Sequence, residues 1–407
     1  MAQQNRVAKA GWYLLGPAFV AAIAYVDPGN VAANISAGAQ FGFLLVWVIV
    51  LANAMAGLVQ YLSAKLGLVT GHTLPEAVRE NTRTPTRIGY WIQAELVAIA
   101  TDLAEVVGGA IALRLLFGLP LLLGGVITGV VSLLLLVVQD RRGQRMFERV
   151  ITGLLMIIAV GFLFSLFVNT PPAGEVIGGL LPRFDGVESL LLATAMLGAT
   201  VMPHAVYLHS GLARDRHGHP PAGAARALLL RATRWDVGIA MLIAGAVNMS
   251  MLLVAATNLQ GTPDTDSIEG AHAAVRDTLG PTVALFFAIG LLASGLASTS
   301  VGAYAGAMIM QGLLRKSFPL LVRRLITLIP ALVVLAAGVD PSRALVISQV
   351  VLSFGIPFAL VPLVRLTSNP ALMGSDANRR LTAVLGWGIA ATITLLNVVL
   401  IYLTLTR

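Results

Sequence analysis

The sequence lacks cysteine and is poor in charged residues. No Cys occurs among its 407 residues, which excludes disulfides, thiolate metal sites and thiol nucleophiles within them. Charged residues make up 11% of the chain and hydrophobic residues 57%, whereas soluble domains carry roughly 25% charged residues. Because so little charge cannot cover a water-exposed surface, the composition predicts a membrane protein with no sizeable soluble domain.

Long apolar runs take the place of the missing charge. Runs of about 20 residues recur from near residue 12 to residue 405, and they do not alternate like strands of an outer-membrane barrel. The N-terminal stretch has no typical small-residue cleavage site, so we expect a retained first helix and not a signal peptide. We predict one all-α transmembrane domain over residues 1–407 with eleven spans, centred near residues 25, 53, 102, 128, 158, 200, 246, 295, 330, 355 and 394.

Basic residues are unevenly distributed between these spans. If the N-terminus is cytoplasmic, 22 of the 27 Lys and Arg residues fall in cytoplasmic segments, among them Arg6 and Lys9. The positive-inside rule then predicts that the N-terminus lies in the cytoplasm and the C-terminus outside. This placement also accounts for the net charge of +8 without a nucleic-acid partner.

The first and sixth predicted spans each contain a proline beside polar residues. In AYVDPGNVA, residues 24–32, Pro28 has no N–H and therefore frees the carbonyl of Ala24, four residues earlier. In GATVMPHAV, residues 198–206, Pro203 frees the carbonyl of Ala199 in the same way. Since an unpaired carbonyl in lipid costs several kcal/mol, each break must face protein, water or an ion. The alternative is that both prolines only kink packed helices.

The spacing of the two breaks predicts an internal repeat. They lie five spans apart, so the second enters the membrane from the opposite side, which is typical of inverted-repeat transporters with a site at the bilayer midplane. We predict a first repeat of five helices in residues 1–170, a second, inverted repeat in residues 186–368, and an eleventh helix at residues 381–405.

The residues at the breaks suggest a cation site. Asp27 supplies a carboxylate, Asn30 an amide oxygen on the same side of a helical turn, and Met202 a thioether. With the carbonyls of Ala24 and Ala199, this set favours Mn²⁺ or Fe²⁺ over Mg²⁺ and Ca²⁺, which gain little from sulfur. The alternative for Met202 is a packing role.

DPGN in the first span and MPH in the sixth resemble the signature pair of the Nramp family of proton-coupled divalent metal transporters, which includes bacterial manganese importers. The stretches ATDLAE, VNMSM, LLASGLAST and SQVVLSFGIPFALVPL are also similar to that family. The resemblance implies a LeuT-type fold in the bacterial cytoplasmic membrane, with helices 1 and 6 broken. It implies metal coordination by Asp27, Asn30, Met202 and the carbonyls of Ala24 and Ala199, joined by Gln349 when the site is occluded. Magnesium-transporting relatives replace the methionine.

A stripe of acidic residues marks the third span. Glu95, Asp102 and Glu105 lie within an arc of roughly 80° on one helix face, and buried carboxylates can exist neutral or charged, so they could pass a proton. Arg323 and Arg324 at the start of the ninth span are candidate partners. The resemblance implies a polar network of this kind leading to the cytoplasm. The alternative is a fixed set of ion pairs.

Three further polar residues are expected near the breaks. Asp27 is the expected first proton donor, because an arriving dication favours its charged form. His204 could titrate near physiological pH, or it could be a neutral hydrogen-bonding group. Asn248 in the seventh span is expected to make a polar contact to the broken helices, although a share in gating is an alternative.

We therefore predict a monomeric secondary transporter that imports Mn²⁺ or Fe²⁺ as substrates with protons, holds no resident cofactor and is not an enzyme. A cation-coupled amino-acid transporter of the same fold is one alternative, but Asp27 would repel a substrate carboxylate. An intramembrane metal-dependent enzyme is another, but a thioether with two backbone carbonyls makes a poor Lewis-acid site. A channel is a third, although channels rarely need two opposed broken helices.

Overall fold

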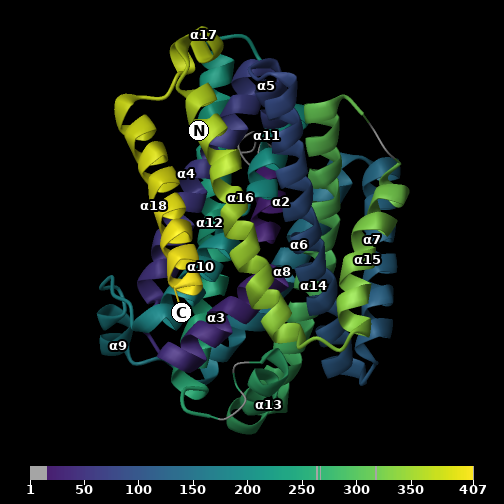
Figure 1. The fold of residues 1–407 in the computed structure, drawn as a ribbon, viewed down its shortest axis with the longest axis vertical. Coiled ribbons are helices and arrows are strands. Elements are labelled where there is room, and N and C mark those ends of the chain that lie inside the picture. Colours follow the sequence, from purple (N-terminus) through teal and green to yellow (C-terminus); the bar gives the residue numbers. More distant parts are fainter. Residues whose placement is uncertain (1–15, 263–264, 266, 317–318, 407) are drawn as a thin grey trace, which may run out of the picture.

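The structure is a computed structural model that describes residues 16–262, 265, 267–316 and 319–406. These residues form a bundle of helices with no strand among them (Figure 1). The predicted positions of Arg6 and Lys9 at the N-terminus lie outside the described residues.

The helices of the first half precede residue 180. Their bounds are α2 (Pro17–Ile23), η1 (Ala24–Val26), α3 (Pro28–Phe41), α4 (Val46–Thr70), α5 (Leu74–Glu80), α6 (Thr84–Phe117), α7 (Leu121–Arg142), α8 (Gln144–Val168) and α9 (Ala173–Gly178). The second half comprises α10 (Gly186–Thr200), α11 (Pro203–His217), α12 (Ala224–Asn258), α13 (Ile268–Leu279), α14 (Pro281–Leu314), α15 (Leu320–Ala336), α16 (Pro341–Thr367), α17 (Pro370–Met373), η2 (Gly374–Asp376) and α18 (Arg380–Leu405).

Eight helical segments among the described residues are long and apolar enough to cross a membrane. They are α4, α6, α8, the pair α10 and α11, α12, α14, α16 and most of α18, and two shorter apolar segments fall within α2–η1 and α7. Each of the eleven predicted span centres falls on a helical element. The chain is therefore a multi-pass membrane protein, and the count of eleven crossings stays a prediction.

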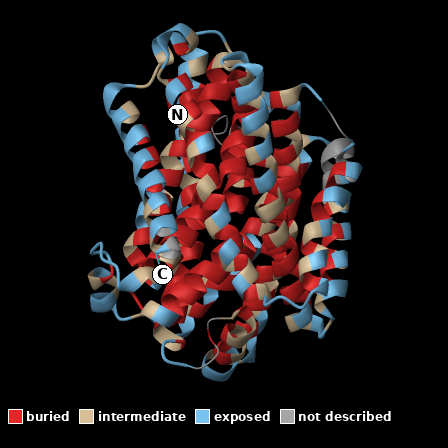
Figure 2. Cartoon of the chain, viewed as in Figure 1, coloured by how far each residue is buried: buried red, intermediate tan, exposed pale blue. Residues whose placement is uncertain are grey.

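The broken helices occupy the centre of the bundle. In the most apolar stretch of α10 and α11, 94% of the residues are buried, against 29% for α18, which lies at the edge. Figure 2 shows the same contrast between a buried interior and the exposed face of α18. The polar residues beside the two breaks, Asp27, Asn30 and His204, are therefore removed from both water and lipid.

Helices of the two halves pack in corresponding pairs. The half-helices after the breaks correspond to each other: α3 packs against α12, and α11 packs against α4. The half-helices before the breaks do so as well: α2 packs against α8, and α10 packs against α16. α6 of the first half contacts α14, its counterpart in the second. In Figure 1 α2 lies above α3 whereas α10 lies below α11, so the two broken helices run in opposite directions. This packing supports an inverted repeat, while the repeat boundaries stay predictions.

Candidate metal site between the broken helices

The first break lies at Pro28, as predicted. α2 ends at Ile23, a 3-10 turn follows, and Asp27 is extended with φ −70° and ψ 168° before α3 begins. Gly29 lies so close to α16 that a Cβ atom would stand 1.8 Å from Nε2 of Gln349. A side chain at residue 29 would therefore displace the side chain of Gln349.

Side chains from two other helices pair with backbone carbonyls of this break. Nδ2 of Asn248, on α12, donates to the carbonyl of Tyr25 over 2.7 Å. Oγ of Ser294, on α14, donates to the carbonyl of Val26 over 2.5 Å. The predicted contact of Asn248 with a broken helix is confirmed. The role of Ser294 was not predicted, because its stretch of small residues gave no local sign of a partner.

The second break lies at Pro203. α10 ends at Thr200, and Val201 and Met202 leave the helical conformation with ψ 67° and ψ 120° before α11 begins. Met202 is fully buried. The prediction that both prolines break their helices, instead of only kinking them, is confirmed.

Asn30 connects the two breaks. Its backbone N and its Nδ2 each donate to Oδ1 of Asp27 over 2.8 Å, and Nδ2 also donates to the carbonyl of Ala199 over 2.9 Å. Oγ1 of Thr200 donates to Oδ1 of Asn30 over 3.4 Å. Pro203 thus frees the Ala199 oxygen from the helix, and the amide of Asn30 donates to it.

Gln349 lies against both broken helices. Its side chain lies against Gly29 of α3. Its backbone oxygen would stand 2.1 Å from a Cβ atom at Gly198, so α10 approaches α16 very closely. Oε1 of Gln349 has no hydrogen-bond partner among the described residues, and neither has Oδ2 of Asp27. The position of Gln349 agrees with its predicted place beside the site.

The arrangement is suited chemically to a desolvated cation. The predicted ligand residues are at most 1% exposed: Ala24, Asp27, Asn30, Ala199, Met202 and Gln349. Buried acceptors without a donor are rare and require an explanation, such as an ion. The unpaired oxygens of Asp27 and Gln349, next to backbone carbonyls at two helix breaks, are acceptors that a cation can satisfy.

The acidic residues of α6 face arginines of α15. Oε1 of Glu95 lies 2.8 Å from Nη2 of Arg323, and Oδ1 of Asp102 lies 2.5 Å from Nη1 of Arg324. Nε of Arg324 also donates to Oγ of Ser132 on α7 over 3.2 Å. The predicted pairing of these acids with the two arginines is confirmed. A proton route and a fixed set of ion pairs would both show this pairing, so it does not distinguish them.

Glu105 differs from the other two acids. It is fully buried, and neither carboxylate oxygen has a hydrogen-bond partner within the described part of the chain. A Cβ at Gly302 on α14 would lie 3.1 Å from Oε2 of Glu105. His204 is also buried, with Nδ1 3.4 Å from Oγ1 of Thr101, while its Nε2 is unpaired in the described structure.

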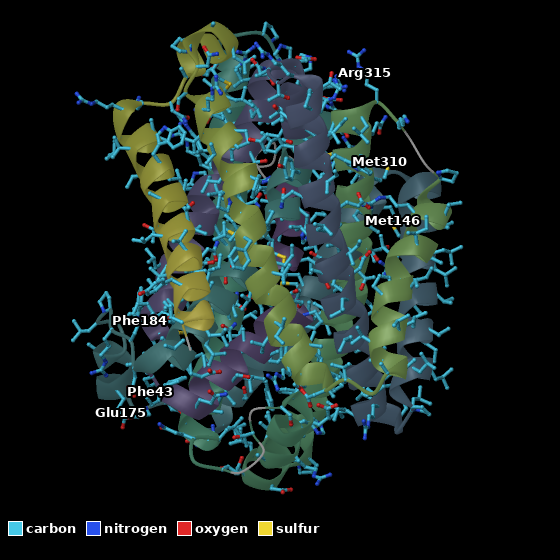
Figure 3. All side chains as sticks on the ribbon, in the orientation of Figure 1. Phe43, Met146, Glu175, Phe184, Met310 and Arg315 are labelled. Atoms are coloured by element: carbon cyan, nitrogen blue, oxygen red, sulfur yellow. The ribbon has the colours of Figure 1, made fainter. Side chains whose placement is uncertain are left out.

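Hollows open near both ends of the bundle. Arg323, Met310 and Glu76 contribute to a cavity of about 280 Å³, and Figure 3 places Met310 towards the end that carries Arg315. Phe43 and Glu175 contribute to a cleft of about 380 Å³, and Figure 3 places both at the opposite end. No predicted ligand residue lines either hollow, which agrees with the burial of the site.

Two further polar contacts on the broken helices were not predicted. The Asp236 carboxylate on α12 accepts hydrogen bonds from the backbone N atoms of Gly16 and Ala18, each over 3.0 Å, at the start of α2. The Tyr207 hydroxyl on α11 donates over 3.2 Å to the carbonyl of Phe358. Pro362 lies four residues after Phe358, so the proline rule that found the breaks could have found this carbonyl.

Comparison with known proteins identifies the family of the chain. The model of a family described as natural resistance-associated macrophage protein-like (Nramp) matches residues 18–403. The chain is 70% identical over 407 residues to "Divalent metal cation transporter MntH" of Mycobacterium tuberculosis strain H37Rv, with 100% of this chain and 95% of the relative covered.

Solved structures agree as well. The crystal structure of an Eremococcus coleocola manganese transporter, in complex with an aromatic bis-isothiourea substituted compound, has a TM-score of 0.85 and 33% identity, covering 95% of this chain and 85% of that one. MhsT in complex with L-phenylalanine shares only the fold, with a TM-score of 0.61, 13% identity, and coverage of 95% of this chain and 97% of that one. The fold is thus of the LeuT type. Because the family model spans nearly the whole sequence, the chain belongs to the natural resistance-associated macrophage protein-like (Nramp) family.

Proposed function

We propose that this protein imports divalent transition-metal ions such as Mn²⁺ and Fe²⁺ into the cytoplasm, coupled to protons, by alternating access. The observation that carries the proposal is the Asp27 carboxylate, buried between two broken helices with Oδ2 unpaired in the described structure. The 70% identical relative is named a divalent metal cation transporter, and the structural relative a manganese transporter.

The proposed ligands share the two breaks and the adjoining face of α16. They are Asp27, Asn30, Met202, the carbonyls of Ala24 and Ala199, and Gln349. Nδ2 of Asn30 donates to Asp27 and Ala199, so an incoming metal would replace these two hydrogen bonds and take Oδ1 of Asn30 as a ligand. The thioether of Met202 would favour Mn²⁺ and Fe²⁺ over the hard ions Mg²⁺ and Ca²⁺.

Broken helices allow the site to open to one side at a time. The half-helices on either side of Asp27 and Met202 are joined only by short non-helical segments, so they can move separately against the remaining helices. The membrane potential would favour inward movement of a cation by about 2.3 kcal/mol per charge per 100 mV.

The proposed proton route begins at Asp27. An arriving dication stabilises the charged carboxylate and expels its proton. Glu105 would receive this proton, since it is buried and unpaired in the described part of the chain. Asp102 with Arg324 and Glu95 with Arg323 would pass it on to the cavity that Arg323 lines. His204 would contribute to the pH dependence from its position beside Thr101.

We also propose the setting in which the transporter works. It functions as a monomer in the lipid bilayer of the bacterial cytoplasmic (inner) membrane, with its N-terminus in the cytoplasm and its C-terminus outside. The two inverted repeats are residues 1–170 and 186–368, followed by an eleventh helix at residues 381–405. The biased distribution of Lys and Arg supports this orientation.

The alternatives find less support. The comparisons favour a transporter over an enzyme. A cation-coupled amino-acid transporter would need room for a substrate carboxylate, which the adjacent Asp27 carboxylate would repel. A channel does not require two opposed helix breaks.

One experiment tests the whole proposal. The purified protein is reconstituted into vesicles, and uptake of Mn²⁺, Fe²⁺, Ca²⁺ and Mg²⁺ is measured while the internal pH is recorded. We expect Mn²⁺ and Fe²⁺ uptake accompanied by internal acidification. Uptake of Mg²⁺ as fast as that of Mn²⁺ would contradict the proposed substrate class. Metal uptake without any proton movement would contradict the proposed coupling.

A further inference from the structure

A groove between α6 and α16 runs along the outer face of the bundle. It encloses about 410 Å³, and Gly89, Leu96, Val351 and Phe358 contribute to its lining. Leu96 is 60% exposed, Phe358 46% and Val351 42%, so the groove opens outwards from the helices. Apart from Gln93, the lining side chains are apolar, which is suitable for a hydrocarbon chain.

A polar cavity of about 110 Å³ lies beyond this groove along the same two helices. Its lining includes Tyr90, Arg365 and Asn369. On α16, Val351, Phe354, Phe358, Pro362 and Arg365 follow one another at intervals of three or four and share one helix face, and Asn369 lies just beyond the end of this helix. The rings of Tyr90 and Phe358 meet edge to face, with centroids 6.2 Å apart, where the two hollows adjoin.

The cavity offers donors and no acid. Arg365 is exposed, and its side chain has no hydrogen bond or ion pair with any described residue. Asn369 accepts from the backbone N of Ala371 over 2.9 Å through Oδ1, which leaves its Nδ2 as a donor. No Asp or Glu is among the described residues that line the cavity. Its charge is therefore complementary to a phosphate group, which Arg can bind through two parallel hydrogen bonds.

We propose that an anionic phospholipid binds here, with its phosphate at Arg365 and one acyl chain in the groove between α6 and α16. From Val351 to Arg365 the helix advances by about 21 Å at 1.5 Å per residue, against about 15 Å for half of a 30 Å hydrocarbon core. The groove therefore lies at acyl-chain depth when Arg365 is at the headgroups. A free phosphate would leave the apolar groove unfilled. A second copy of this chain, packed in parallel on the groove, would bring two positively charged Arg365 side chains together, and they would repel each other.

The bound lipid would touch the part of α16 that supports the second break. A Cβ at Gly355, in the groove, would lie 2.5 Å from Val97 and 3.1 Å from Cγ of Pro203. The Phe358 carbonyl accepts from the Tyr207 hydroxyl of α11 over 3.2 Å. An acyl chain packed on Gly355 and Phe358 would therefore favour the arrangement in which α16 contacts α11.

The glycines of this chain allow a precise test of the groove. A Cβ at Gly89 would meet no atom of the described residues within 4 Å, so Gly89→Leu adds a side chain to a residue of the groove lining without a clash at Cβ. Gly153, on α8 and away from the groove, is equally open and provides a matched control, Gly153→Leu. Leu has a higher helix propensity than Gly, so neither variant should impair folding.

The experiment uses native mass spectrometry of the full chain, delipidated in mild detergent and titrated with phosphatidylglycerol or with phosphatidylcholine of the same acyl chains. We expect one phosphatidylglycerol molecule per monomer, bound about tenfold more tightly than phosphatidylcholine, because the cationic choline group offsets the attraction between the phosphate and Arg365. Arg365→Gln should remove this preference, while Arg83→Gln, at an exposed position that does not line the cavity, should keep it. Gly89→Leu should weaken binding of both lipids, and Gly153→Leu neither.

Three outcomes would overturn the proposal. The first is unchanged phosphatidylglycerol binding by both Arg365→Gln and Gly89→Leu. The second is displacement of the lipid by an equal concentration of inorganic phosphate, which would assign the cavity to a free anion. The third is a dimer of the parent protein that Gly89→Leu dissociates, which would assign the groove to a second copy. Because no metal or proton gradient is present, the result is independent of the proposed transport function.

Discussion

The side-chain amide of Asn30 donates a hydrogen bond to the carbonyl of Ala199 across 169 residues of sequence, with 2.9 Å between the two atoms. The same amide nitrogen lies 2.8 Å from Oδ1 of Asp27. One side chain thus ties the carboxylate of the first break to a carbonyl of the second. A metal that takes these oxygens would replace both hydrogen bonds, so the ion would take over the connection that Asn30 makes between the two broken helices.

The first prediction concerns Asp27. Asp27→Asn removes the only negative charge among the proposed ligands, while its amide keeps the size of the carboxyl group. We expect Mn²⁺ uptake into vesicles to fall at least about tenfold, equivalent to about 1.4 kcal/mol or more of lost binding free energy. Asp277→Asn, at an exposed surface position, is the matched control. Robust uptake by the Asp27 variant would end the site assignment.

The second prediction concerns selectivity. Met202→Ala removes the thioether, the one soft group in the proposed set, so Mn²⁺ should lose more affinity than Ca²⁺ or Mg²⁺. The ratio of Mn²⁺ to Ca²⁺ uptake should fall by about tenfold, or about 1.4 kcal/mol. Competition uptake in proteoliposomes measures this ratio. Met251→Ala, which replaces a buried methionine outside the ligand set, controls for packing. An unchanged ratio in the Met202 variant would refute the sulfur argument.

The third prediction separates a proton route from an ion-pair lattice. Glu105 has no partner in the described structure, so Glu105→Gln should cost little stability but should reduce metal-linked proton flux several-fold if the carboxyl group carries protons. Asp102→Asn should also reduce proton flux. It should in addition destabilise the protein, because Arg324 would lose its charged partner at 2.5 Å. Proton flux recorded with a pH-sensitive dye, together with thermal unfolding, distinguishes a proton route from a fixed ion-pair lattice. Intact flux in both variants would favour the lattice.

The fourth prediction concerns the support of the first break. Asn248→Ala leaves the Tyr25 carbonyl without its donor at 2.7 Å, and an unpaired buried acceptor costs about 1–3 kcal/mol. We expect a lower midpoint of thermal unfolding in detergent, measured by intrinsic fluorescence. Asn169→Ala removes an exposed side-chain amide that donates to Asn258, its one partner within the described structure, so its midpoint should stay near that of the parent. Equal midpoints for the two variants would show that the break does not depend on Asn248.

The sequence predicted those features that follow from local covalent chemistry. Whether a proline breaks its helix depends on the surroundings, since α16 continues through Pro357 and Pro362. The N–H missing at Pro28 or Pro203 frees a carbonyl in either case, so the freed carbonyls could be predicted. The donors to those carbonyls could not, because they depend on how distant helices approach. Nothing near Ala199 indicates that Asn30 reaches it. The roles of the predicted ligands remain proposals.

The same limit applies to α16. Pro357 and Pro362 free the carbonyls of Ser353 and Phe358 by the four-residue rule, and both positions can be read from the sequence. Their donors, Nδ2 of Asn397 at 2.9 Å and the hydroxyl of Tyr207 at 3.2 Å, lie on helices whose contact with α16 only the fold reveals. Proline positions therefore indicate where acceptors become free, and tertiary packing decides what pairs with them.

The last prediction concerns Asp236, whose carboxylate holds the start of α2 through the backbone N atoms of Gly16 and Ala18. Each hydrogen bond to a charged group contributes about 1.5–3 kcal/mol, so Asp236→Ala should release this end of α2. The chain has no Cys, so a single cysteine replacing the buried Ala21 of α2 reports its exposure. A water-soluble maleimide should label Ala21→Cys at least about tenfold faster when Asp236→Ala is also present.

Asp376 supplies the control for this experiment. Its carboxylate pairs with Arg226 over 3.2 Å and makes no bond to α2, so Asp376→Ala should leave the labelling rate of the Ala21 cysteine unchanged. Asp236→Asn should be intermediate, because the amide oxygen can accept one of the two hydrogen bonds. If Asp236→Ala and Asp376→Ala label at the same rate, packing alone holds α2 closed. If only Asp236→Ala accelerates labelling, the two bonds from Gly16 and Ala18 keep this half of the first broken helix against the bundle.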